Sequence, residues 1–275
     1  MKLFSKLENT IELSGRELSD SEKNKISELK FFVNYGRLKE LKLINFNLNS
    51  LAGLELLSNL VSLDCSWNRI SSWEIGGIQE NLAELNLAGN YLSETVGLGL
   101  LPNLKRLNLY KNRYFTLPEF PVLEKLEVLV LTDNQLKNIA GIRFLSSLKE
   151  LYCWDNKIPD LESVEELFNL EVLLCHENQI TSLAPISHLK KLRILDCNLN
   201  PISSLKGIES LDCLEELSCR KTKISSLHEI SALKNLKKLC CLPNENLEES
   251  AVNLIRDLGF VLSEPKSSGV FRRHV

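Results

Sequence analysis

The 275-residue sequence predicts an α/β solenoid built on a parallel β-sheet, and three observations lead to this prediction. A leucine recurs every 22 residues, and apolar residues stand at fixed offsets from it. An asparagine stands eight residues after this leucine in almost every unit. Self-similarity at a fixed period of roughly 20 to 50 residues is typical of solenoids, in which each unit buries its apolar face against its neighbours.

Ten leucines define position 1 of the repeat: Leu38, Leu60, Leu82, Leu104, Leu126, Leu148, Leu170, Leu192, Leu214 and Leu236. Position 4 is leucine throughout, from Leu41 to Leu239. Position 6 is leucine or cysteine: Leu43, Cys65, Leu87, Leu109, Leu131, Cys153, Cys175, Cys197, Cys219 and Cys241. Position 9 is asparagine in eight of the ten repeats, with Phe46 and Thr222 as the exceptions.

Each conserved offset has a physical role in a stacked strand. Positions 4 and 6 point to the same side of a short strand, because side chains alternate with a period of two. The asparagine amide can donate and accept hydrogen bonds, so it can satisfy backbone groups of neighbouring turns as a ladder. Positions 17 (Leu54 to Ile230) and 20 (Leu57 to Leu233) supply two further inward columns. The remaining length leaves room only for a short 3₁₀ or helical turn.

The pattern L-x-x-L-x-L-x-x-N-x-L, repeated over residues 38–241, resembles the short, 22-residue class of leucine-rich repeats. The leucine-rich regulatory subunit of protein phosphatase 1 typifies this class, and many bacterial leucine-rich-repeat proteins, including exported effectors, share it. The resemblance implies a leucine-rich-repeat solenoid with a parallel β-sheet on the concave face and short 3₁₀ or helical turns on the convex face. The matching motif is the structural frame, so it assigns no binding residue.

Both ends of a solenoid need a cap over the exposed core. Residues 1–37 are expected to be an N-terminal cap, with Ile11 and Leu13 in a degenerate first repeat and a helix carrying Ile26, Leu29, Phe32 and Val33. Ten repeats follow over 38–244. Residues 245–262 are expected to form a helical C-terminal cap with Gly259 at its end, and 263–275 a flexible tail.

Composition favours a soluble protein in a reducing compartment. Net charge is −3, which argues against a nucleic-acid partner, and no apolar run suggests a membrane segment or signal peptide. All eight cysteines are expected to be free thiols; the six at position 6 point into the core, whereas Cys213 and Cys240 fall outside that column. We therefore expect a cytoplasmic location, with export into a host cytosol by a specialised secretion system as the alternative.

Catalysis is not expected. Cys175 and His176 are adjacent on a strand, so their side chains diverge and cannot form a nucleophile–base pair. The chain has no glycine-rich phosphate loop and no paired metal ligands, so we expect no catalytic residue, no cofactor and no metal.

Partner contacts are expected on the variable strand positions 2, 3, 5, 7 and 8, which face the concave side and whose exposed aromatic side chains do nothing for the frame. Tyrosine and tryptophan frequently anchor interfaces. Acidic residues coincide with the aromatic ones in the fifth to seventh repeats, and basic residues flank them, which favours a protein partner with a basic and apolar patch. The predicted partner-binding residues are Trp67, Tyr110, Lys111, Tyr152, Trp154, Asp155, His176, Glu177 and Arg220.

Three functions fit these observations. The first is a monomeric, non-catalytic scaffold that grips a partner protein on its concave face. The second is an exported bacterial effector that binds a host protein, and the third is a structural or self-assembling spacer module.

Overall fold

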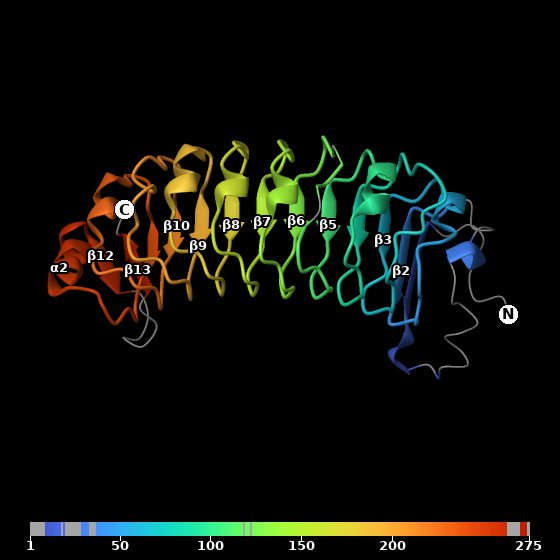
Figure 1. The fold of residues 1–275 in the computed structure, drawn as a ribbon, viewed down its shortest axis with the longest axis horizontal. Coiled ribbons are helices and arrows are strands. Elements are labelled where there is room, and N and C mark those ends of the chain that lie inside the picture. Colours follow the sequence, from blue (N-terminus) through green and yellow to red (C-terminus); the bar gives the residue numbers. More distant parts are fainter. Residues whose placement is uncertain are drawn as a thin grey trace. The chain divides into compact units, whose positions relative to one another are not determined.

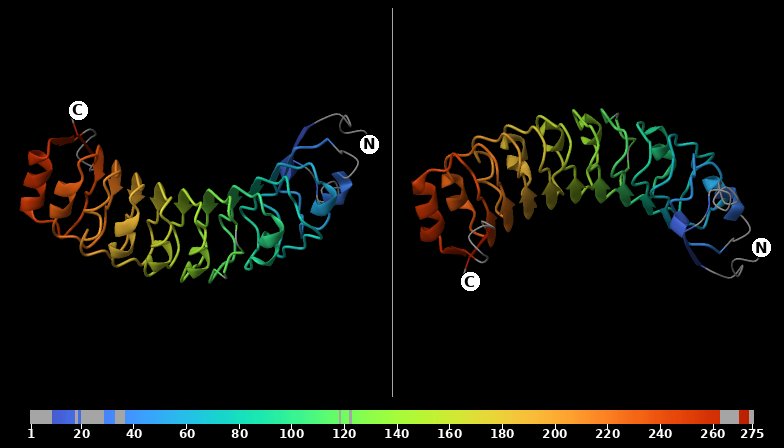
Figure 2. Two further views of the ribbon diagram at one scale, coloured as in Figure 1. Left: turned by 90° about the horizontal axis from the view of Figure 1, so that it is seen from above. Right: turned by 90° about the horizontal axis from the view of Figure 1, so that it is seen from below.

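The computed structural model describes residues 9–17, 19, 29–32, 37–117, 119–121, 123–262 and 270–273. The chain forms two compact units, an N-terminal unit, Met1–Asn134, and a C-terminal unit, Gln135–Val275. The sequence does not signal this division, because the 22-residue period continues through it. Within each unit the strands lie side by side and the 3₁₀ turns lie opposite them (Figures 1 and 2).

The N-terminal unit contains parallel strands that pair in chain order. Leu41 pairs with Leu63 and Leu63 with Leu85, so neighbouring strands are offset by one 22-residue repeat. Its strands are β1 (Thr10–Ser14), β2 (Glu40–Ile44), β3 (Ser62–Asp64), β4 (Glu84–Asn86), β5 (Arg106–Asn108) and β6 (Val128–Val130). Its 3₁₀ turns are η1 (Gly15–Glu17), η3 (Leu29–Phe32), η4 (Leu54–Leu56) and η5 (Val96–Leu100).

The C-terminal unit continues the same pattern and ends differently. Its parallel strands are β7 (Glu150–Tyr152), β8 (Val172–Leu174), β9 (Ile194–Asp196), β10 (Glu216–Ser218) and β11 (Lys238–Cys240). Its turns are η6 (Ala140–Ile142), η7 (Glu162–Val164), η8 (Ala184–His188) and η9 (His228–Ala232), followed by the helix α2 (Glu249–Asp257). Two antiparallel strands then close the sheet, β12 (Phe260–Leu262) and β13 (Val270–Arg273).

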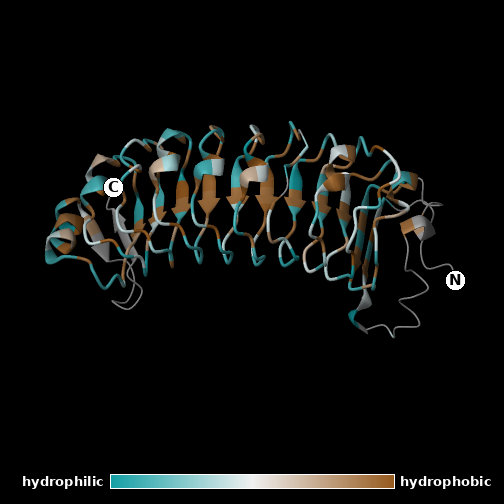
Figure 3. Ribbon diagram, viewed as in Figure 1, coloured by the Kyte–Doolittle hydropathy of each residue, from teal (hydrophilic) through white to brown (hydrophobic). Residues whose placement is uncertain are grey.

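The core consists of the columns that the repeat predicts. Leucines at positions 1 and 4 are at most 2% exposed, and all six position-6 cysteines are fully buried. Burying one leucine stabilises a fold by about 1.5–3 kcal/mol, so the columns supply the main driving force. Figure 3 shows hydrophobic residues on the strands and hydrophilic residues along the turns that follow them.

The buried asparagines form the predicted ladder. The Oδ1 of Asn178 accepts a hydrogen bond from the N–H of Ile158 at 2.9 Å, and its Nδ2 donates to the carbonyls of Cys153 and Cys175 at 3.0 and 3.1 Å. Thr222, an exception to the pattern, donates from its hydroxyl to the Cys219 carbonyl at 3.0 Å. Its backbone N–H donates to Asn244 of the next repeat at 2.6 Å, so the ladder reaches the tenth repeat.

At the N-terminal cap, Ile11 lies buried in β1 as expected, and Leu29 and Phe32 are also buried. The described residues 29–32 form a 3₁₀ turn, not an α-helix. The other positions of the expected helix, including Ile26 and Val33, lie outside the described residues.

The C-terminal cap differs from the expectation. The helix α2 covers nine residues, Glu249–Asp257, with Ala251 and Ile255 buried. It ends there because Gly259 takes a left-handed conformation (φ 77°), as the sequence suggests, and the chain then enters β12. The expectation of a flexible tail is wrong for residues 270–273, since β13 pairs with β11 and covers the backbone groups at its edge. No helix in the described ranges is long and apolar enough to cross a membrane.

We expect Asn178→Ala to lower the free energy of unfolding by about 2–4 kcal/mol, because it leaves several buried backbone groups without partners. Chemical denaturation measures this loss. The control is Asn169→Ala, whose amide donates to the Ser146 carbonyl and accepts from the Lys191 ammonium in surface contacts that water can replace; its cost should stay below about 1 kcal/mol. Equal losses for both variants would contradict a structural role specific to the ladder.

Candidate functional site

Position 8 is a left-handed backbone position in the first nine repeats, which the sequence does not reveal; the tenth repeat has Pro243 there. The nine residues at this position, all with φ between 51° and 66°, are Asn45, Trp67, Gly89, Lys111, Asp133, Asp155, Glu177, Leu199 and Lys221. Glycine and asparagine adopt this conformation readily, whereas other residues lose about 1–2 kcal/mol. The side chains at position 8 are therefore carried by a rigid turn at the end of each strand.

Position 5 also has a structural role in several repeats, although it was expected to belong to the variable binding face. Asp64 accepts a hydrogen bond from the backbone N–H of Ser66 at 2.8 Å, and Asn108 accepts one from Tyr110 at 2.9 Å. Asn86 and Asp196 make the same contact in their repeats. Short polar side chains at position 5 therefore fix the turn that presents positions 7 and 8.

In the N-terminal unit, the structure brings the predicted residues Trp67, Tyr110 and Lys111 together. The Trp67 and Tyr110 rings meet edge to face, with centroids 6.4 Å apart and an interplanar angle of 76°. Gly89 lies beneath the indole, since a Cβ at this glycine would come within 2.6 Å of the ring. The Lys111 ammonium lies 3.4 Å from the Asp133 carboxylate. We call Trp67, Gly89, Tyr110, Lys111 and Asp133 the N-terminal patch.

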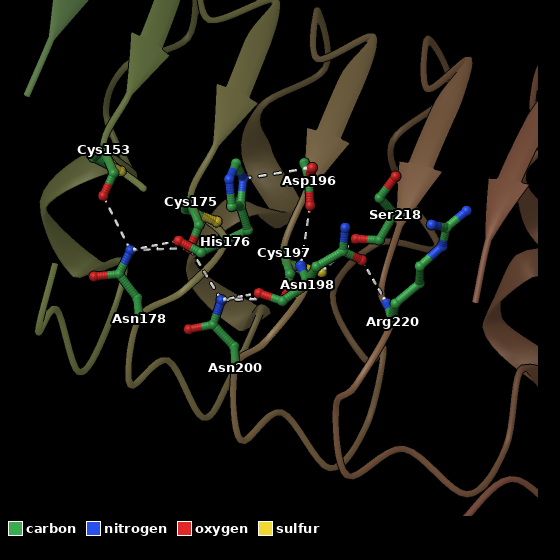
Figure 4. Close-up of polar contacts among 10 residues, drawn as sticks. All are labelled: Cys153, Cys175, His176, Asn178, Asp196, Cys197, Asn198, Asn200, Ser218 and Arg220. Atoms are coloured by element: carbon green, nitrogen blue, oxygen red, sulfur yellow. Dashed lines mark hydrogen bonds and ion pairs between the residues drawn. The ribbon is translucent and has the colours of Figure 1, made fainter. Parts of the chain in front are cut away.

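In the C-terminal unit, Trp154 and His176 stack face to face. Their centroids are 4.9 Å apart and their planes differ by 12°. The Nδ1 of His176 lies 3.5 Å from the Asp196 carboxylate (Figure 4). Nδ1 is buried and has no hydrogen-bond partner among the described residues. The pair is thus held by ring stacking, with the Asp196 carboxylate beside the imidazole.

The neighbours of this pair extend the surface along the strands. Tyr152 donates from its hydroxyl to the Glu150 carboxylate at 2.7 Å. The backbone N–H of Arg220 donates to the side chain of Asn198 at 2.5 Å (Figure 4), while its Nε is buried without a hydrogen-bond partner. The exposed carboxylates of Asp155 and Glu177 follow at position 8. We call Tyr152, Trp154, Asp155, His176, Glu177, Asp196 and Arg220 the C-terminal patch.

All nine predicted site residues therefore belong to one of two patches, one in each unit. Sequence reasoning missed Gly89, Asp133 and Asp196 as members. A glycine at position 8 beside an aromatic residue one repeat earlier is the signal that could have identified the first of them.

The arrangements that resemble catalytic groups do not support catalysis. Cys175 is fully buried, and burial raises the pKa of its thiol well above the usual value, while His176 lies on the other face of the strand. Ser226 and Glu229 both approach the same nitrogen of His228, Nδ1, at 3.1 and 3.3 Å. A relay needs contacts to opposite ring nitrogens. Among the described residues, no group of acidic, histidine or cysteine side chains could hold a metal ion.

The column of cysteines is unpaired and buried. Burial raises the pKa of the Cys153 and Cys241 thiols to about 12, and it also raises the pKa of the Cys65, Cys197 and Cys219 thiols well above the usual value. Seven of the eight cysteines are buried, and Cys213 alone is exposed. The column therefore acts as a set of small apolar side chains.

A known protein family and several solved structures are similar to this chain. A family model described as leucine-rich repeats (two copies) matches residues 124–166 and 168–211. No curated protein matches the chain in sequence. Among solved structures, an internalin from Listeria monocytogenes is 24% identical, with a TM-score of 0.63 and coverage of 81% of this chain and 72% of the internalin.

Two further structures are similar. The functional domain of InlJ from Listeria monocytogenes, described as including a cysteine ladder, is 19% identical (TM-score 0.54; 87% of this chain and 64% of that one). The ectodomain of the Arabidopsis thaliana receptor kinase GASSHO1/SCHENGEN3, in complex with CASPARIAN STRIP INTEGRITY FACTOR 2, is 24% identical (TM-score 0.59; 85% and 32%). Similarity at this level shows the fold, which is a leucine-rich-repeat solenoid of the short-repeat type.

We expect a thiol reagent to modify one cysteine rapidly in the native protein and all eight after unfolding, because only Cys213 is exposed. Absorbance of the released chromophore counts the thiols. The control is Cys213→Ser, in which the fast phase should disappear. Any fast thiol in that variant would show that a buried cysteine is accessible.

Proposed function

We propose that this leucine-rich-repeat chain is a non-catalytic scaffold that binds a partner protein on the solvent-facing side of its sheet. The observation that carries the proposal is the stacked pair of Trp154 and His176 in the C-terminal patch. Leucine-rich repeats commonly serve as interaction scaffolds, and the similar Arabidopsis ectodomain has a complex with another factor.

The stacked pair suits an interface anchor for an energetic reason. Both rings are partly exposed, so a partner can still bury apolar surface on them. Because the rings are already fixed against each other, binding costs less side-chain entropy than ordering two free side chains. Tryptophan, tyrosine and arginine dominate the few residues that carry most binding energy, and the C-terminal patch contains one of each.

The charge of the C-terminal patch narrows the range of partners that complement it. Asp155 and Glu177 expose carboxylates at successive turns, and Asp196 contacts His176. A partner that presents basic and apolar side chains complements this surface, and the complementarity favours encounter and orientation more than affinity. The N-terminal patch, with its Trp67–Tyr110 pair and Lys111, offers a second contact area in its own unit.

The proposed compartment is a reducing one, because all eight cysteines are unpaired. The cytosol of the producing cell meets this requirement, and so does a host cytosol reached by export.

We expect the double variant Tyr152→Ala/Trp154→Ala to bind its partner at least about tenfold more weakly, since losing one interface anchor costs about 1–2 kcal/mol or more. The partner is first captured from native lysate with the wild-type protein, and its affinity is then measured by calorimetric titration.

The matched control for this test is Phe144→Ala/Phe168→Ala. Both phenylalanines are more than half exposed but follow the 3₁₀ turns and not the strands. The control should bind as the wild type does. Unchanged affinity of the Tyr152/Trp154 variant, or an equal loss in both variants, would refute the placement of the site.

A further inference from the structure

A groove of about 550 Å³ lies in the N-terminal unit along the turns that follow its strands. It is lined by residues at positions 8, 9 and 10 of the first four repeats, together with Arg16. It shares Trp67, Gly89 and Lys111 with the N-terminal patch and follows the turns after the strands, which are largely hydrophilic in Figure 3.

The groove is strongly basic. Four cationic side chains line it, Arg16, Arg69, Lys111 and Arg113, and no carboxylate does. Arg69 and Arg113 are exposed, and neither makes an ion pair within the described part of the chain. This concentration of positive charge is unexpected in a chain whose net charge is −3. An anionic ligand is therefore the complementary occupant.

Aromatic rings lie between the cations. Tyr91 separates Arg69 from Arg113 along the repeats, and the Arg113 guanidinium lies 4.0 Å from the centroid of its ring. Trp67 is 43% exposed and Tyr91 41%, so both rings keep surface for a ligand. A guanidinium held on a ring is pre-organised, so it loses less entropy when it binds an anion.

The spacing of the cations selects the shape of the ligand. Arg69 and Arg113 both occupy position 10, in repeats that are two steps apart. Because in-register strands are spaced by about 4.8 Å, their backbones are about 10 Å apart. In a polyproline II helix, residues i and i+3 lie on the same side and are separated by about 9 Å. In a β-strand, residues i and i+3 face opposite sides, so the match is poorer.

We propose that this groove binds an acidic, proline-containing peptide segment in the polyproline II conformation. Carboxylates at every third residue contact Arg69 and Arg113, and the prolines between them pack on Trp67 and Tyr91. Aromatic-lined grooves favour this conformation because it is already extended and loses little entropy on binding. Nucleic acid is a poorer fit, since it needs a longer basic stripe than four cations supply.

The test uses the full-length chain and a fluorescein-labelled peptide of four Glu-Pro-Pro triplets, followed by fluorescence anisotropy at low salt. We expect a dissociation constant below about 100 µM that rises with added salt. The variant Arg69→Ala/Arg113→Ala should bind at least about tenfold more weakly. Trp67→Ala should also weaken binding, by several-fold, because the prolines lose part of their platform.

The matched control is Lys157→Ala/Lys223→Ala, which removes two exposed cations from the same repeat position in the C-terminal unit. It should bind the peptide as the wild type does, and thermal melting should show both double variants to be folded. A peptide of four Gln-Pro-Pro triplets should not bind. A peptide with the same composition but its glutamates adjacent should bind more weakly.

Several results would overturn the proposal: a dissociation constant of the wild type above about 100 µM at low salt, equal binding of the Arg69/Arg113 variant, an equal loss in the lysine control, or equal binding of the glutamine peptide. Tighter binding of a single-stranded oligonucleotide that displaces the peptide would assign the groove to nucleic acid instead. The outcome is independent of the partner test above, because the arginine variant leaves the C-terminal patch unchanged.

Discussion

The asparagine ladder is the interaction on which the rest of the structure depends. A strand of three residues pairs only a few backbone groups, and the turns after it would otherwise leave many carbonyls and N–H groups buried without partners. Asn178 alone serves the backbone of its own repeat and of the preceding one. Because one amide links two repeats, every repeat must keep the same length and turn, and the 22-residue period follows from this requirement.

Because the ladder fixes the turn, the residues that hold the backbone are different from the residues that face solvent. Once the turn is fixed, position 8 takes a left-handed conformation in the first nine repeats, for residues as different as Gly89 and Trp67. Gly89 does so at little cost, whereas Trp67 and Leu199 lose about 1–2 kcal/mol each. A bulky side chain at such a position does not improve the frame, so its presence needs another reason. At Trp67 the structure offers one, since the indole packs over Gly89, meets Tyr110 and lines the basic groove.

Periodicity predicts the buried columns, the asparagine ladder and the terminating glycine of α2, because each follows from local spacing. It does not predict what depends on contacts across repeats. The stacking of Trp154 on His176 depends on side-chain rotamers, and the groove joins Arg69 and Arg113, which are 44 residues apart in the sequence.

The pairing of β13 with β11 escaped prediction for a similar reason, since residues 270–273 carry no repeat pattern and pair with the open edge of β11. Position 5 was assigned wholly to the surface, because a polar residue that caps its own turn looks identical in sequence to one that binds a partner.

The cysteine column makes the packing of the C-terminal unit sensitive to oxidation. Five successive repeats of the C-terminal unit place a fully buried thiol at position 6, from Cys153 to Cys241. The parallel strands that precede these thiols are spaced by about 4.8 Å, whereas a disulfide needs Cβ atoms about 3.8 Å apart, so oxidation would require the strands to shift. Such a shift would disturb the ladder, because Asn178 and Asn200 hydrogen-bond to the carbonyls of these same cysteines (Figure 4). The thiols therefore stabilise the unit only while they remain reduced. Because His176 directly follows Cys175 on the chain, a shift of these strands would also displace the stacked pair of Trp154 and His176.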